Sequence, residues 1–135
     1  MRLLQDQGNR AAGDVVGWSS YLEVSAKDAR LEVGSTAYDP AVWGTAVNSE
    51  CKLLLLGHAF DELRMGRVQI KTDIRNERSQ RAIAAIGATY EGVLRRYQRR
   101  GDLTVRDTVL FSVTAEEWPA VRDHLVERIA ARRGR

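Results

Sequence analysis

The stretch that decides the fold of this chain is Tyr38-Asp39-Pro40-Ala41-Val42-Trp43-Gly44-Thr45-Ala46-Val47-Asn48-Ser49-Glu50-Cys51. It follows residues 30–38 (RLEVGSTAY), whose composition predicts a strand, and it runs into a segment with helical spacing. A glycine-containing loop therefore leads directly into a helix N-terminus. Free backbone N–H groups at such a corner favour a phosphate, although many strand-to-helix turns contain a glycine for steric reasons alone.

The helix after this loop is predicted from a broad apolar stripe. Asn48 or Ser49 is expected to cap it, and Gly66 is expected to lie beyond its end. The stripe consists of Leu53, Leu54, Leu56, Ala59, Phe60 and Leu63. Such a stripe is typical of a helix that packs on a core.

Upstream of the loop, residues 15–24 (VVGWSSYLEV) predict a strand that pairs antiparallel with residues 30–38 across the polar turn at 25–29. Downstream, residues 67–72 (RVQIKT) alternate as a short strand. The order so far is strand, strand, helix, strand.

A second helix is expected to begin with Asn76 as N-cap and to end at Gly87. Residues 89–97 and 105–113 predict two antiparallel strands, and the final helix follows the capping-box spacing of residues 114–117 (TAEE). No repeat or long linker interrupts the pattern, so residues 1–135 are expected to form a single domain.

Composition excludes several classes of protein. Hydrophobic residues make up 44% and charged residues 29%, which is typical of a globular domain. The longest apolar run covers only residues 53–56, and residues 1–13 are too polar for a signal peptide, so we expect no membrane association and a cytoplasmic location. One cysteine, Cys51, with His58 and His124 far apart, predicts neither a disulfide nor a metal site.

A net charge of +3 raises the possibility of nucleic-acid binding, but the excess lies in two local clusters. These are Arg95, Arg96, Arg99 and Arg100, and Arg128, Arg132, Arg133 and Arg135. Such clusters are more typical of solvated faces or of a basic rim beside a phosphate-rich ligand. A nucleic acid is therefore not the expected partner.

Five segments in order resemble those of RimJ/RimL-like members of the GNAT acetyltransferase superfamily. Residues 44–51 (GTAVNSEC) resemble the G-x-G/A-x-x-T-E-A segment, and residues 73–79 (DIRNERS) resemble D-x-x-N-x-x-S. Residues 82–88, 91–95 (EGVLR) and the Arg106-Asp107 pair resemble the three segments that follow. The similarity covers residues 14–125.

The resemblance implies an α/β (α+β) fold: a mixed, mostly antiparallel twisted sheet with flanking helices, splayed between residues 30–38 and 67–72. Acetyl-CoA would lie in the splay. The strand and two helices with which this family begins have no counterpart before Val15, and residues 1–5 supply at most a short strand. The exposed sheet edge then favours a homodimer.

The resemblance also implies the residues that hold the coenzyme. The backbone of Ala37 and Tyr38 would pair with the pantetheine arm, and Asn76 would help to hold it. The pyrophosphate would meet the backbone N–H groups of Trp43, Gly44, Thr45, Ala46, Val47 and Asn48. Ala41 departs from the family, which has Gln or Arg at this position.

The implied activity is N-acetyl transfer from acetyl-CoA to an amine, either a protein N-terminus or a small molecule. Ser79 is the predicted acid for the leaving thiolate, and it also lies among the coenzyme contacts. The family's base glutamate falls at Gln98, which cannot accept a proton, so Glu91, Tyr97 or a water relay would replace it. The alternative is a catalytically silent GNAT-fold module that binds coenzyme A or a partner protein.

Overall fold

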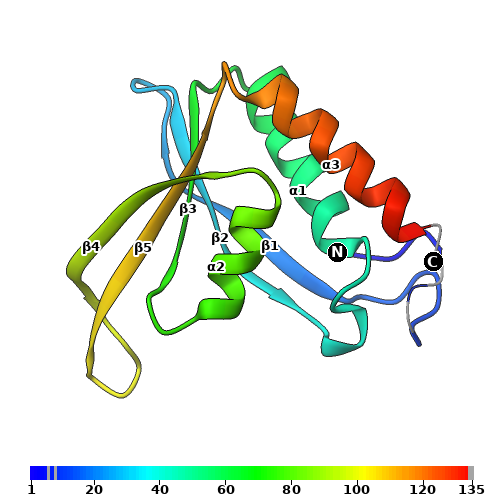
Figure 1. The fold of residues 1–135 in the computed structure, drawn as a ribbon, viewed down its shortest axis with the longest axis horizontal. Coiled ribbons are helices and arrows are strands. Elements are labelled where there is room, and N and C mark those ends of the chain that lie inside the picture. Colours follow the sequence, from blue (N-terminus) through cyan, green and yellow to red (C-terminus); the bar gives the residue numbers. More distant parts are fainter. Residues whose placement is uncertain (6, 8, 134–135) are drawn as a thin grey trace.

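The computed structural model describes residues 1–5, 7 and 9–133 and shows three helices against one sheet (Figure 1). The strands are β1 (Gly17–Ser25), β2 (Arg30–Tyr38), β3 (Arg67–Asp73), β4 (Thr89–Arg99) and β5 (Val105–Thr114). The helices are α1 (Val47–Gly57), α2 (Glu77–Ala85) and α3 (Trp118–Arg133), with a 3-10 turn at Pro40–Val42 and a π-helical turn at His58–Glu62. Strand and helix positions agree with the sequence prediction to within a few residues. The two short turns were not predicted.

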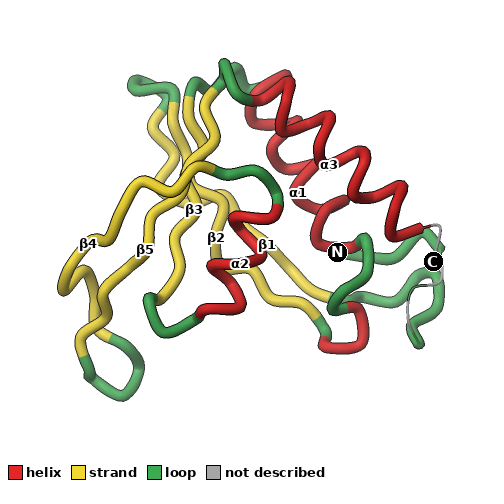
Figure 2. Tube along the Cα trace, in the orientation of Figure 1, coloured by secondary structure: helices red, strands yellow, loops and turns green. Residues whose placement is uncertain are grey.

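The five strands form one sheet in the order β1-β2-β3-β5-β4. The pairs β1 with β2, β3 with β5 and β4 with β5 are antiparallel, and only β2 with β3 is parallel. Figure 2 shows the strands fanning apart toward one end of the twisted sheet. The predicted fold class, a mixed and mostly antiparallel sheet with flanking helices, is confirmed.

The separation of β2 from β3 is the feature of the sheet that determines where the other elements lie. Their pairing comprises only Arg30 with Arg67, Leu31 with Val68 and Glu32 with Gln69. Beyond these pairs β2 stays with β1 as far as Tyr38, while β3 stays with β5 as far as Asp73. The two central strands therefore diverge, as predicted, and the facing backbone edge of β2 has no neighbouring strand.

The core lies between one face of the sheet and the helices. Leu56 of α1, Val68 of β3 and Leu125 of α3 are each 0% exposed and belong to one apolar cluster. Helices α1 and α3 lie side by side (Figure 1). Phe60, in the π-helical turn that follows α1, stacks its ring on that of Trp118 at the start of α3, with the ring centroids 5.5 Å apart. Burial of these side chains is the main term that holds the helices on the sheet.

Most predicted helix boundaries are confirmed. The Asn76 side chain accepts a hydrogen bond from Ser79 N at the start of α2, and Gly87 has φ of 96° just beyond its end. Glu117 accepts hydrogen bonds from the backbone N–H and the hydroxyl of Thr114 before α3.

The predicted cap of α1 is wrong. The helix begins one residue earlier than Asn48, with Ala46 at the N-cap and no side-chain cap. The Asn48 side-chain oxygen accepts instead from the Tyr38 hydroxyl, at 2.8 Å, so it is not available to the helix. The first turn of α1 is therefore tied to β2 by side chains rather than closed on itself.

The core assignment predicts different costs for two leucines of α1. Leu56→Ala removes a fully buried side chain and should lower the free energy of unfolding by about 2–5 kcal/mol. Leu54→Ala, two residues away on a side chain that is 73% exposed, should change it by less than about 0.5 kcal/mol. Urea unfolding measures both; equal losses would contradict the packing of α1.

Candidate functional site

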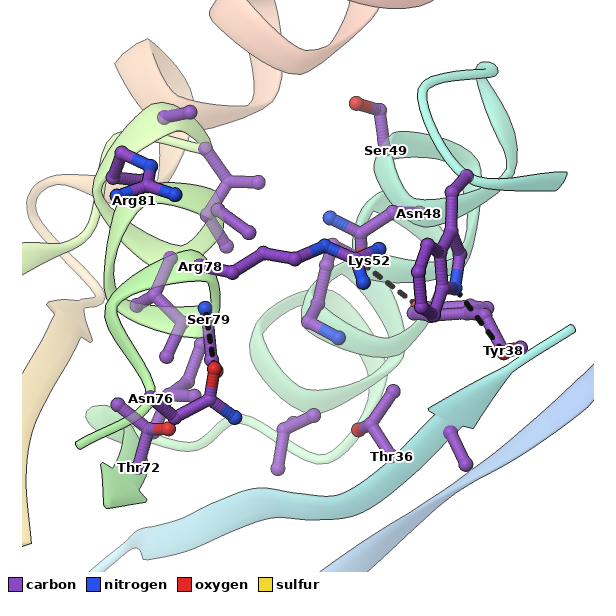
Figure 3. Close-up of a pocket in the computed structure, with 18 of the residues that line it drawn as sticks. Thr36, Tyr38, Asn48, Ser49, Lys52, Thr72, Asn76, Arg78, Ser79 and Arg81 are labelled. Carbon is purple, nitrogen blue, oxygen red and sulfur yellow. Dashed lines mark hydrogen bonds between the residues drawn. The ribbon is translucent and has the colours of Figure 1, made fainter. Parts of the chain in front are cut away.

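A cavity of about 820 Å³ lies where β2 and β3 part. Its walls come from the end of β2, the loop before α1, the inner face of α1, the end of β3, and α2 and α3. Figure 3 shows α2 on one side of this cavity, with β2 and α1 on the other. Of the predicted coenzyme contacts, those that line the cavity are Ala37, Tyr38, Trp43, Gly44, Thr45, Asn48, Asn76 and Ser79.

Ala46 and Val47 do not line this cavity. Both are buried, and Val47 packs in a small apolar cluster with Leu3, Val16 and Val42. Their buried side chains hold the loop on the side away from the cavity, so these residues could contact a ligand only through backbone atoms. Of the six loop residues predicted to contact a ligand, four line the cavity and the other two support the loop.

The loop keeps several backbone N–H groups free. Trp43 N and Thr45 N donate to Pro40 O and Val42 O, and Val47 N donates to the Thr45 hydroxyl. Among the residues that the structure describes, the N–H groups of Gly44, Ala46 and Asn48 have no partner. Gly44 has φ of 76°, which favours glycine at this turn. Free N–H groups in front of a helix are a ready anion site.

Arg132 near the end of α3 holds this loop from the side. One nitrogen of its guanidinium donates to Gly44 O at 2.5 Å and to Thr45 O at 3.1 Å. Its neighbour Arg133 pairs with Glu50 in the first turn of α1. The C-terminal helix thus fixes the carbonyl side of the loop, a contact between residues 88 positions apart that sequence spacing could not reveal.

Tyr38 closes the β2 side of the cavity. Its hydroxyl donates to Asn48 Oδ1, and its ring faces the Lys52 ammonium at 5.8 Å. Burial, together with the neighbouring Cys51, raises the pKa of Tyr38. The phenol therefore stays neutral at physiological pH and acts as a hydrogen-bond donor.

Helix α2 supplies the opposite wall. The Asn76 side-chain oxygen caps the helix, which leaves its NH₂ group for the cavity, and Ser79 lies one turn along (Figure 3). Arg78 extends from α2 to the loop, where its guanidinium stacks on the Trp43 ring at 3.2 Å from the ring centroid. This cation–π contact joins the two walls across the cavity.

The cavity is strongly positive. The cationic residues that line it are Lys52, Lys71, Arg78, Arg81, Arg106, Arg128 and Arg132. The Lys71 side chain is directed to the other sheet face, where it pairs with Glu32. Among the described lining residues Asp73 alone carries a carboxylate, and two short hydrogen bonds pair that carboxylate with Arg100. The lining therefore suits a ligand that carries several negative charges. Sequence reasoning noted the arginine clusters but missed Lys52, whose position in a leucine run gives no signal of function.

The other two predicted catalytic residues lie outside the cavity. Glu91 pairs with Arg67 at 2.6 Å, and the Tyr97 hydroxyl accepts a hydrogen bond from Lys71 at 2.7 Å. Both belong to a polar network over the sheet face opposite the core, which includes the Lys71 to Glu32 ion pair at 3.0 Å. The structure therefore brings neither residue together with Ser79.

The electrostatics of this network bear on proton transfer. Hydrogen bonds from Ser112 and Arg67 lower the pKa of Glu91 below its usual range, so this carboxylate is a weak base. Burial works against the charge on Lys71, but hydrogen bonds with Tyr97, Glu32 and Glu23 prevail and raise the pKa of this lysine. Both groups stay charged near neutral pH.

No group of three or more His, Cys, Asp or Glu side chains in the described part of the chain could hold a metal ion. Within the same residues no helix is long and apolar enough to cross a membrane.

The sequence matches the acetyltransferase (GNAT) domain over residues 3–89, which is more than half of the chain. This chain belongs to the GNAT acetyltransferase family. The GNAT match covers the parting strands, the loop and α1, and it ends at the first residue of β4. A comparison with curated proteins gave no match.

Solved structures of GNAT proteins have the same fold. A candidate acetyltransferase from T. thermophilus is 48% identical with a TM-score of 0.83, and the alignment covers 88% of this chain and 63% of that one. A GCN5-related N-acetyltransferase from Brucella melitensis is 27% identical (TM-score 0.81; 85% and 52% covered). Mycobacterium smegmatis RimJ in complex with CoA-disulfide is 25% identical (TM-score 0.76; 91% and 58%). This chain spans less than two thirds of each of these proteins.

The contact of Arg132 with the loop predicts a local effect. Arg132→Ala should speed amide exchange in residues 43–49 by roughly 5-fold, because about 1 kcal/mol of hydrogen bonding to the loop carbonyls is lost. Hydrogen–deuterium exchange with mass spectrometry measures this. Arg122→Ala, at an exposed arginine earlier in α3, is the matched control. Unchanged exchange in Arg132→Ala would rule out the bracing role.

The Asp73 to Arg100 pair predicts a pH dependence. Arg100 lowers the pKa of Asp73, so the pair stabilises the fold fully above the unfolded pKa of about 4 and less as the pH falls through the folded value. Asp73→Asn should lower Tm at pH 7, and its difference from the wild type should shrink below about pH 4. A difference that is the same at pH 3 and pH 7 would contradict the assignment. Thermal melts followed by circular dichroism measure it.

Proposed function

We propose that this chain is a RimJ/RimL-like N-acetyltransferase domain, which transfers an acetyl group from acetyl-CoA to an amine. The observation that carries the proposal is the cavity between β2 and β3, which brings free loop N–H groups and unpaired cations to one place. The resemblance of residues 44–51 to the family's loop and the RimJ structure with bound CoA-disulfide support it.

The residues present fit coenzyme A. The cavity volume of about 820 Å³ lies in the upper part of the usual range for ligand pockets, roughly 300–1,000 Å³. The loop N–H groups of Gly44, Ala46 and Asn48 suit the pyrophosphate. The unpaired edge of β2 at Ala37 and Tyr38 suits an extended arm with amide groups, because it offers backbone donors and acceptors that no strand uses.

Acetyl-CoA supplies the acyl thioester when it is bound. The chain would contribute by fixing the arm against β2 and α2, so that an incoming neutral amine meets the thioester in near-attack geometry. The Asn76 NH₂ group would hold the arm, and the Ser79 hydroxyl would donate a proton to the leaving sulfur. A water relay is the proposed route for the amine proton, because Glu91 and Tyr97 are held in hydrogen bonds on the other sheet face.

A second function has its own supporting observation. The position expected for a base is Gln98, and the two nearby candidates are held in other contacts. A catalytically silent domain that binds coenzyme A without turnover fits these facts. Transfer of the acetyl group to an acceptor, whether a protein N-terminus or a small amine, would distinguish the active enzyme from the silent domain.

The loop assignment is tested with Gly44→Glu. Space is open around the Cβ position of Gly44, so a glutamate there should be tolerated sterically while it places a carboxylate beside the proposed pyrophosphate. We expect acetyl-CoA affinity to fall by at least roughly 10-fold. Isothermal titration calorimetry measures it. Gly44→Asn, a neutral residue that tolerates positive φ, controls for the backbone strain.

Turnover is measured beside binding. Thiol release from acetyl-CoA with a panel of amines and N-terminal peptides is expected for the wild type and not for Gly44→Glu. Saturable binding without thiol release across the panel would favour the silent module. Unchanged coenzyme affinity in Gly44→Glu would exclude this loop as the pyrophosphate site.

A homodimer is also proposed, because β1 and β4 are the two edges of the sheet. Light scattering at micromolar concentration tests it, and a stable monomer would count against it.

A further inference from the structure

Lys52 is a buried lysine of α1. The chain has three lysines, and Lys27 lies exposed in the turn between β1 and β2. Lys52 is only 5% exposed, yet among the described residues its ammonium has no hydrogen bond and no ion pair. Its ammonium lies 5.8 Å from the centroid of the Tyr38 ring. That distance lies at the outer limit of a cation–π contact.

Lys71 is a partly buried lysine with a structural role, and it offers a comparison for Lys52. Its side chain is 9% exposed, and it has Glu32 at 3.0 Å, Glu23 at 3.2 Å and the Tyr97 hydroxyl at 2.7 Å. These partners raise its pKa. Burial without such partners lowers the pKa of Lys52, which means that the fold disfavours the charge at this position. The Lys71 ammonium is therefore compensated by carboxylates and a hydroxyl, whereas among the described residues the Lys52 ammonium has no such compensation.

The position of Lys52 connects it with the loop. It lies four residues after Asn48, so the two side chains share one face of α1, and both line the cavity. The Cα–Cβ bonds of a helix tilt toward its N-terminus, which here carries the free N–H groups. Figure 3 shows Lys52 between Arg78 and Tyr38.

Arg128 adds an independent sign of a missing partner. This residue of α3 lines the same cavity, and its Nε is buried without a hydrogen bond. Buried donors are nearly always paired in folded proteins. An unpaired ammonium and an unpaired guanidinium N–H therefore face one space from two helices.

We propose that Lys52 is the buried counter-charge of a diphosphate, that of coenzyme A, bound between the N-terminus of α1 and the end of α3. The proposal rests on the function proposed above and adds the group that compensates the diphosphate charge. Residues 39–46 of the loop (DPAVWGTA) include no lysine or arginine, so the loop supplies no cation of its own. Lys52 supplies that charge from the helix instead.

The proposal makes stability and binding change in opposite directions. An uncompensated buried charge destabilises the free protein, and an apolar side chain of similar length removes this cost. Lys52→Met should therefore raise Tm of the free protein by roughly 2–5 °C while it weakens binding of a diphosphate ligand. A lysine that only supports the fold would not show this opposition.

The experiment uses calorimetry with a ligand series on the full chain. Coenzyme A carries the diphosphate and a 3′-phosphate, dephospho-CoA carries the diphosphate alone, and pantetheine carries neither. Lys52→Met should lose roughly 10–100-fold in affinity for coenzyme A and for dephospho-CoA, and nothing for pantetheine. Lys52→Arg should retain most of the affinity, because it keeps the charge.

Lys27→Met is the matched control, since it removes the same charge from an exposed turn. It should leave both Tm and affinity unchanged. Equal affinity of wild type and Lys52→Met for both diphosphate ligands would overturn the proposal. A loss for coenzyme A but not for dephospho-CoA would overturn it too, because Lys52 would then serve the 3′-phosphate. A fall in Tm of Lys52→Met, with equal loss for all three ligands, would identify a structural lysine.

Failure of the proposed function gives a different result. In that case the wild type itself binds neither coenzyme A nor dephospho-CoA. Inorganic pyrophosphate is then the remaining probe. If the wild type binds pyrophosphate and Lys52→Met does not, the chain has a diphosphate site that does not serve coenzyme A. If the wild type does not bind pyrophosphate, the proposal is overturned.

Discussion

The structure depends on the short parallel pairing of β2 with β3. Three residue pairs hold these strands together, and beyond Glu32 and Gln69 each strand follows its outer neighbour. A continuous sheet would satisfy all the backbone groups at this position and leave no room for a ligand. Because the strands part, the edge of β2 is unpaired and both helix N-termini, of α1 and α2, come to the same cavity.

The cavity lining carries an excess of positive charge that the stability of the fold does not require. Cations come from α1, α2, β5 and α3, whereas Asp73, the one carboxylate among the described lining residues, is held by Arg100. Structural cations elsewhere have partners, as in the pairs of Arg67 with Glu91 and Lys71 with Glu32. Among the described residues, the Lys52 ammonium and the Arg128 Nε have no such partner, and a bound anion would lower the free energy of the whole arrangement.

Local patterns predicted the elements because helix and strand periodicity and the caps at Asn76 and Thr114 are properties of short segments. The parting of the central strands came from the resemblance to a family rather than from spacing. Contacts between distant residues could not be predicted: Arg132 bracing the loop, Arg78 stacking on Trp43, and Asn48 engaged by Tyr38 instead of capping α1. The burial of Lys52 was hidden for the same reason, since a lysine in a leucine run gives no sign of which way it faces.

The most direct measurement is hydrogen–deuterium exchange of the chain with and without saturating acetyl-CoA. A ligand between the parted strands should slow exchange in three separate segments, residues 33–38, 43–52 and 72–80, and leave the β4 to β5 turn at 100–104 unchanged. Protection confined to other segments, or none at saturation, would contradict the assignment of this cavity as the coenzyme site.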